Sequence, residues 1–91
     1  MTWSEEEYVG YLQGERRCYA WVMRRHGGLT PDQAWQAAVE RYPYEPSDEL
    51  YRGLLFHDEA WHWAMLALYG ARYTVEHPEL IEPSAEYRAL D

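Results

Sequence analysis

The 91-residue sequence has no lysine and no asparagine, and it has only one cysteine, one isoleucine and one phenylalanine. Because Cys18 is alone, no disulfide can form within the chain, so we expect a reducing compartment and a buried, unreactive thiol. No signal-peptide pattern and no long apolar run occurs near the start, where Glu5, Glu6 and Glu7 follow one another. These absences predict a cytoplasmic protein that does not cross a membrane.

Positive charge is also scarce. Eight cationic residues, all arginine, stand against 16 acidic ones, for a formal net charge of −8. This charge disfavours nucleic acid and anionic membranes as partners. Apolar surface is abundant instead, with 47% hydrophobic and 16% aromatic residues. A domain of this size buries a limited core. Part of this surface therefore either faces a partner or belongs to an aromatic core whose polar tips reach water.

Helix-start and helix-stop signals predict one all-α domain over residues 1–91. It has three main helices and a short C-terminal turn in a small orthogonal, bundle-like arrangement. The first helix begins at Ser4, and Glu7 three residues later completes a capping box. The pair Gly27–Gly28 ends this helix. Ser84 is expected to begin the short C-terminal turn.

The second and third helices follow from the same kind of signal. Thr30 and Gln33 form a second capping box, and Pro43 stops the second helix. The third helix is predicted to be the longest, running from its cap Ser47 to Gly70 or beyond. One apolar seam of this helix would comprise Leu50, Leu54, His57, Trp61, Ala64 and Leu68.

The densest polar cluster is His-Asp-Glu-Ala-Trp-His at residues 57–62. Its histidines are five residues apart, so it is not the His-Glu-x-x-His zinc motif. Glu59 and His62 do form one Glu-x-x-His pair, a unit of di-iron bundles, and Glu15 offers a further carboxylate. A surface pair of Asp58 with His62, and a hydrogen-bonded core His57, explain the same residues without a metal. By its own residues the chain is not predicted to bind a metal or to form an active site.

Five segments follow one another in a characteristic order and spacing. They are Glu-Arg-Arg-Cys-Tyr-Ala at 15–20, Gly-Leu-Thr-Pro-Asp-Gln at 28–33, Ala-Ala-Val-Glu-Arg-Tyr at 37–42, His-Asp-Glu-Ala-Trp at 57–61 and Ala-Met-Leu-Ala-Leu-Tyr-Gly at 64–70. In this order, residues 15–70 resemble the helical N-terminal region of the nitrile hydratase β subunit. The resemblance lies in the order of the segments and not in one specific motif.

The resemblance implies a subunit that binds no cofactor of its own. Nitrile hydratases hydrate a nitrile to an amide at a Co(III) or Fe(III) ion, which a Cys-x-x-Cys-Ser-Cys segment of the α subunit holds. This chain lacks that segment, and it also lacks the β-barrel half of the family's β subunit. The implied partners are a nitrile hydratase α-type subunit and a separate β C-terminal-type subunit, as in thiocyanate hydrolase and toyocamycin-type nitrile hydratase.

The same resemblance implies site residues. Those expected to wall a pocket for a small nitrile are His57, Trp61, Trp35 and Gln36. His57 would orient substrate or water and Trp61 would form an apolar wall, while Trp35 or Gln36 replaces an arginine that bonds the family's oxidised cysteines. The residues expected at the partner interface are Trp21, Tyr19, Glu59 and Tyr69.

Two alternatives stay open. Activator proteins that deliver metal to the α subunit are similar to this helical region and also lack the barrel. A metallochaperone with transient binding therefore fits the same residues. The second alternative is an unrelated acidic interaction or inhibitor domain, in which the pattern has arisen by chance.

Overall fold

The computed structural model describes residues 3–90, and within that range it contains helices and no strand. The prediction of an all-α domain is confirmed. Among residues 3–90, none of the helices combines the length and the apolar composition of a membrane span. In chain order the elements are α1 (Glu5–Gly27), α2 (Pro31–Arg41), the 3-10 helix η1 (Leu54–His57), α3 (Ala60–Tyr69), α4 (Tyr73–Glu76), the 3-10 helix η2 (Pro78–Leu80) and α5 (Ala85–Arg88).

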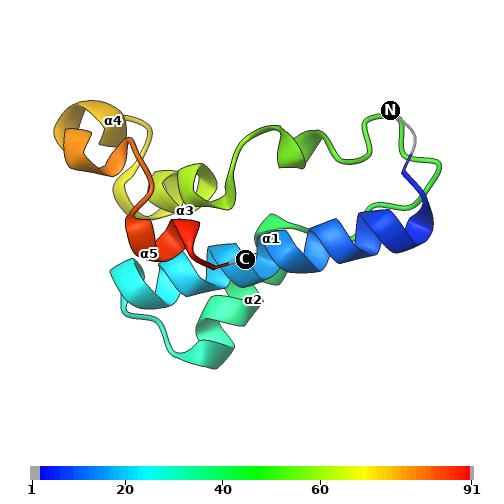
Figure 1. Cartoon of the computed structure of the whole chain (residues 1–91), viewed down its shortest axis with the longest axis horizontal. Helices are drawn as coiled ribbons and strands as arrows, with labels where there is room; N and C mark the ends of the chain where they lie inside the picture. Colours follow the sequence, from blue (N-terminus) through cyan, green and yellow to red (C-terminus); the bar gives the residue numbers. More distant parts are fainter. Residues whose placement is uncertain (1–2, 91) are drawn as a thin grey trace.

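The long helix α1 is the axis of the molecule, with α2 packed on one side and α3 on the other (Figure 1). It begins as predicted. The Ser4 hydroxyl accepts a hydrogen bond from the Glu7 backbone N–H, and the Glu7 carboxylate accepts one from the Ser4 N–H, both at 3.1 Å. After Gly27 the helix ends at Gly28, whose φ of 69° is left-handed. Glycine adopts this conformation without a Cβ clash, so the predicted end is also confirmed.

Helix α2 is confirmed by its own capping box. The Thr30 hydroxyl accepts from the Gln33 N–H at 3.2 Å, and the Gln33 side chain accepts from the Thr30 N–H at 3.1 Å. Its contact with α1 is close, because the residues that face the core are the small and fully buried Ala34 and Ala38. The end of α2 is fixed by Arg16 of α1, whose guanidinium donates twice to the Tyr42 carbonyl, at 2.7 and 2.9 Å.

The third helix was predicted to begin after Ser47, and that prediction is wrong. Helix α3 begins at Ala60, and residues between Ser47 and Gly53 form turns. Gly53 has a φ of 85°, which a right-handed helix excludes. The expected apolar seam is therefore divided: Leu50 is 81% exposed and Leu54 64% exposed, whereas Trp61 and Ala64 are buried.

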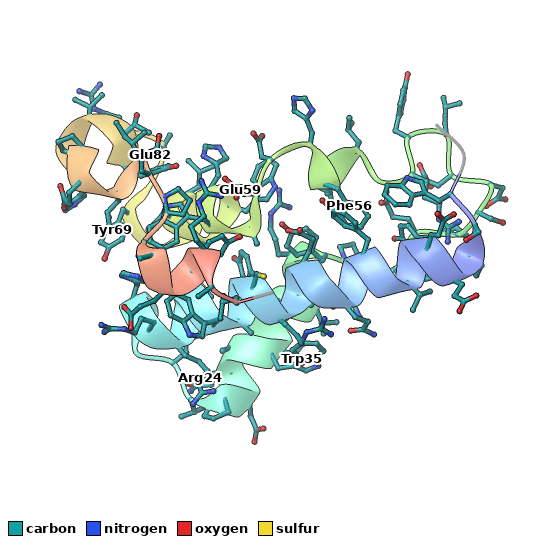
Figure 2. All side chains as sticks on the ribbon, in the orientation of Figure 1. Arg24, Trp35, Phe56, Glu59, Tyr69 and Glu82 are labelled. Atoms are coloured by element: carbon teal, nitrogen blue, oxygen red, sulfur yellow. The ribbon has the colours of Figure 1, made fainter. Side chains whose placement is uncertain are left out.

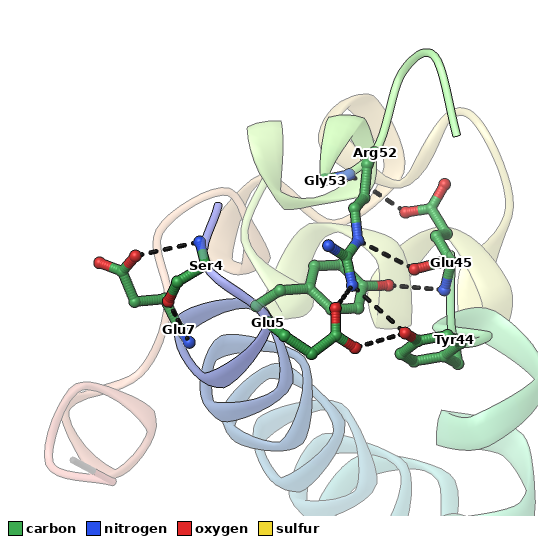
Figure 3. A network of polar contacts seen from close by, with 8 residues as sticks. Ser4, Glu5, Glu7, Tyr44, Glu45, Arg52 and Gly53 are labelled. Atoms are coloured by element: carbon green, nitrogen blue, oxygen red, sulfur yellow. Dashed lines mark hydrogen bonds and ion pairs between the residues drawn. The ribbon is translucent and has the colours of Figure 1, made fainter. Parts of the chain in front are cut away.

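A polar network explains why the segment before η1 is not helical (Figure 3). The Arg52 side chain donates to the Glu45 carbonyl at 2.9 Å and to the Glu5 carboxylate at 2.6 Å. Its guanidinium carbon lies 3.7 Å from the centre of the Tyr8 ring. The Gly53 N–H, which a continuous helix would bond to a carbonyl one turn earlier, donates to the Glu45 carboxylate at 3.1 Å. These contacts hold the connector between α2 and η1 on the first turns of α1.

The core is largely aromatic. The Phe56 ring of η1 lies against Tyr11 and Tyr8 of α1, with ring centres 4.7 and 5.8 Å apart. At the other end of α1, Tyr87 of α5 packs edge-on against Trp61 at 5.4 Å, and its hydroxyl accepts from the Trp61 backbone N–H at 3.3 Å. Ser84 caps α5 as predicted. The aromatic residues therefore join the connector and the C-terminal helix to α1 and α3.

Candidate functional site

A groove of about 580 Å³ opens between α1, the segment around η1, and α5. We call it the central groove. Its floor includes Gly10 and Gly14, and its walls include residues 56–59 and 87–88. A Cβ at Gly10 would meet no atom within 4 Å, and one at Gly14 would meet only the Arg17 side chain, at 3.7 Å. The missing side chains leave space above α1, on the side toward which Phe56 and Glu59 lie (Figure 2).

Polar groups gather at the rim of the central groove. Glu59 and Arg88 form an ion pair at 2.7 Å, with both side chains about half exposed, so the pair adds little to stability. The side chains of His57 and Asp58 are exposed and form no hydrogen bond or ion pair within residues 3–90. Burial raises the pKa of Tyr87, so its hydroxyl stays protonated at neutral pH. The rim therefore offers an imidazole and carboxylates as hydrogen-bonding groups for a ligand or partner.

A second groove, of about 340 Å³, lies between α1, α2 and the C-terminal segment. We call it the tryptophan groove. Trp21 and Trp35 line it together with Arg17, Arg24 and Leu90. Arg24 and Trp35 lie on the side of α1 where α2 packs, away from Phe56 and Glu59 (Figure 2). The two grooves adjoin, since Gly14, Arg17 and Cys18 of α1 line both. The central groove adds a histidine, carboxylates and Arg88, whereas the tryptophan groove adds two tryptophans and Arg24.

The four residues predicted to wall one pocket are not brought together. His57 lines the central groove, whereas Trp35 lines the tryptophan groove. Trp61 is only 2% exposed, lines neither groove, and donates its indole N–H to the Leu80 carbonyl at 2.8 Å. Gln36 is exposed on α2, where its side-chain amide donates to a glutamate one turn further on. The four predicted pocket residues therefore lie in four different places: the central groove, the tryptophan groove, the core and the exposed surface of α2.

The residues predicted at the partner interface are also spread. Glu59 lines the central groove and Trp21 lines the tryptophan groove. Tyr19 is 4% exposed and belongs to the core. Tyr69 is half-buried and packs against the His77 ring, with ring centres 4.7 Å apart. Glu59 and Trp21 are therefore the members of this set that the folded chain presents at a groove.

Both residues of the Glu-x-x-His pair at the start of α3, Glu59 and His62, make contacts within the fold. Nδ1 of His62 lies 2.8 Å from the Tyr73 hydroxyl, and Glu59 pairs with Arg88. Within residues 3–90, no group of three or more histidine, cysteine, aspartate or glutamate side chains is arranged to hold a metal ion.

The connector between α2 and η1 has an exposed apolar surface that the sequence did not predict. We call residues 48–54 the connector tip. Leu50, Tyr51 and Leu54 are 81%, 67% and 64% exposed there, although the network around Arg52 holds the segment on α1. The predicted helix would have buried both leucines. The sequence signals that favour a non-helical segment are the Tyr-Pro-Tyr-Glu-Pro run before it and Gly53 within it.

Comparisons with protein-family models, with curated proteins and with solved structures found no match for this chain. The resemblance to the nitrile hydratase β subunit therefore rests on the order of sequence segments alone.

Proposed function

We propose that the chain is a non-catalytic small subunit that packs on a metal-bearing partner and walls a ligand pocket with its central groove. By the sequence resemblance, the partner is a nitrile hydratase α-type subunit and the reaction is hydration of a nitrile to an amide. One observation carries the proposal. The segment that would face the substrate by this resemblance, residues 57–61, places His57, Asp58 and Glu59 at the open groove of about 580 Å³.

The properties of the central groove support this role. Its volume falls in the range of about 300–1,000 Å³ that is usual for ligand pockets. Because it is open on one side, a partner subunit would close it. In its neutral form the His57 imidazole both donates and accepts a hydrogen bond, so it would orient a nitrile or the attacking water. The Co(III) or Fe(III) ion would belong to the partner, and a separate β C-terminal-type subunit would complete the assembly.

Trp61 would act on this pocket only indirectly. It packs against Tyr87, which lines the groove. Replacing a buried tryptophan with alanine costs about 3–5 kcal/mol, a large part of the stability of a small domain. A Trp61→Ala variant would therefore report on folding, and residues at the groove itself make better tests.

The first experiment is co-expression with a neighbouring reading frame that encodes the Cys-x-x-Cys-Ser-Cys segment, followed by size-exclusion chromatography and an amide-formation assay. We expect a stable complex of fixed stoichiometry whose activity is lost when this chain is omitted. A partner that gains metal and activity but elutes alone would make the chain an activator. A partner that turns over nitriles equally well without this chain would refute both roles.

Variants of the complex then test the groove. Gly10→Tyr places a ring in the open space above α1, and we expect it to lower kcat/KM by at least about tenfold, equivalent to about 1.4 kcal/mol. The matched control Gly10→Ala adds only a methyl group there and is expected to keep full activity. His57→Ala is expected to lower kcat/KM similarly. Arg72→Gln, which changes an exposed side chain that lines neither groove, should not.

A further inference from the structure

The tryptophan groove presents positive charge and hydrogen-bond donors that the described chain leaves without partners. Arg17, Trp21 and Arg24 are spaced by four and three residues and so share one face of α1, and Trp35 of α2 lines the same groove. Neither arginine forms an ion pair or a hydrogen bond within residues 3–90. This is unexpected in a chain with twice as many acidic as basic residues, 16 against 8.

The two indole groups of this groove differ from those of Trp61 and Trp63 in their hydrogen bonding. Trp61 and Trp63 donate their indole N–H to backbone carbonyls, at 2.8 and 3.1 Å. The indoles of Trp21 and Trp35 donate to no group in the part of the chain that the structure describes. Trp35 is moreover 40% exposed. The side chains of Arg17, Arg24, Trp21 and Trp35 thus offer this groove two apolar rings and hydrogen-bond donors, which suits a partner with an apolar side chain flanked by carboxylates.

The connector tip carries exposed carboxylates and apolar side chains, which complement the arginines and indole rings of the tryptophan groove. The carboxylates of Asp48 and Glu49 are exposed and form no ion pair or hydrogen bond within residues 3–90. Directly after them come Leu50 and Tyr51, the most exposed of the large apolar side chains in the described chain. The tip is held in place by the contacts of Arg52, so it would lose little conformational freedom on binding.

We propose that the connector tip of one copy of this chain docks in the tryptophan groove of a second copy. The carboxylates of Asp48 and Glu49 would pair with Arg17 and Arg24, and an apolar tip residue would lie against the two indoles. This self-association uses the tryptophan groove and not the pocket-forming residues 57–61, and of its four groove groups Arg17 alone also lines the central groove. It does not depend on the function proposed above.

The tip cannot reach the groove of its own chain. Arg52 ties the tip to Glu5 in the first turn of α1, whereas Arg17 and Arg24 lie about 18 to 28 Å further along the helix. In Figure 1 the connector between α2 and η1 likewise runs to the end of α1 at which the N-terminus lies. The contact is therefore between copies and joins two different surfaces. Because such an interface is small, we expect a Kd of about 0.1–1 mM, weakened by salt.

Sedimentation velocity of the full chain, without any partner, tests the proposal. Over about 10 µM to 1 mM we expect the mean mass to rise with concentration at low salt and to fall back at about 1 M salt. The groove variant Arg17→Glu/Arg24→Glu and the tip variant Asp48→Arg/Glu49→Arg are each expected to stay monomeric. Arg72→Glu reverses an exposed charge on neither surface, and it should associate like the wild type.

Mixing the two variants is the decisive step. The tip variant keeps an intact groove and the groove variant keeps an intact tip, so an equimolar mixture should form a complex that neither forms alone. In the wild type, NMR signals of the Trp21 and Trp35 indole N–H groups should shift with concentration, while those of Trp61 and Trp63 stay fixed. A wild type that is monomeric at about 1 mM, or a mixture that stays monomeric, overturns the proposal.

Discussion

Gly53 occupies a position that suits only glycine. Its φ of 85° is left-handed, and a Cβ added there would lie 2.7 Å from Nε1 of Trp3 and 3.3 Å from its Cε2. Any other residue would therefore strain the backbone by about 1–2 kcal/mol and also displace an indole ring. Gly10 is the opposite case, since it lies in regular helix with open space around its Cα.

These two glycines give a paired prediction. Gly53→Ala is expected to lower the free energy of unfolding by about 1–3 kcal/mol, through backbone strain and the clash with Trp3. Gly10→Ala is expected to raise it by about 0.5–1 kcal/mol, because alanine is the better helix former. Urea unfolding followed by circular dichroism measures both. A change of the same sign in the two variants would contradict the different backbone geometries of Gly10 and Gly53.

His26 gives a prediction about pH. Its ring packs edge-on against Trp61 at 5.3 Å and Trp21 at 6.3 Å. Burial, and then the charge of Arg25, lower its pKa below the ordinary value of 6.5. The unfolded chain therefore binds this proton more readily than the folded chain. The stability that His26 contributes is fully present above about pH 6.5 and is lost as pH falls through the lowered folded-state pKa.

We expect the thermal midpoint of the wild type to fall as the pH is lowered from about 7 to about 5.5. In His26→Gln, which cannot titrate, this fall should be smaller. Differential scanning calorimetry across that range measures the difference between the two proteins. Equal slopes would mean that His26 titrates alike in the folded and unfolded chains.

At the scale of elements, the connector depends on one arginine. The Arg52 side chain is only 7% exposed and contacts Glu5, the Glu45 carbonyl and the Tyr8 ring. Arg52→Gln is expected to lower the thermal midpoint and to speed proteolytic cleavage between α2 and η1, with little change in helix content. Arg72→Gln is the matched control, because its pair with Glu76 is exposed and 4.0 Å long. If the two variants are cleaved at the same rate, the network does not hold the connector.

The elements that could be predicted from the sequence are those whose ends are fixed locally. The capping boxes at Ser4 and Thr30 and the cap at Ser84 involve residues three apart, so the pattern contains the whole interaction. The predicted start of the third helix was wrong because Arg52 pairs with Glu5, a residue far away in the sequence. The apolar residues do recur at helical spacing, but Leu50 and Leu54 lie exposed in the connector tip and do not face the core.

At the scale of the whole molecule, the candidate site could be predicted only in part. The sequence resemblance predicted a pocket role for His57 and a partner-interface role for Glu59, and both residues lie at the central groove. The sequence did not indicate that Trp21 and Trp35 meet in a second groove beside the first. That meeting depends on how α2 packs across α1, which the small buried residues Ala34 and Ala38 determine. Residues on different helices share a site only through such packing.

The position of α1 between its neighbours has a further consequence. Helices α2 and α3 both pack mainly on α1 and have no comparable contact with each other. If α2 or α3 unfolds locally, α1 is still covered on its other side. If α1 unfolds, both α2 and α3 lose the helix on which they pack. The amide hydrogens near Val22, which is fully buried, would then exchange with solvent only when the whole chain opens. The C-terminal part of this one helix, around Val22, thus reports the global stability of the protein, and the elements on its two sides open as separate, smaller units.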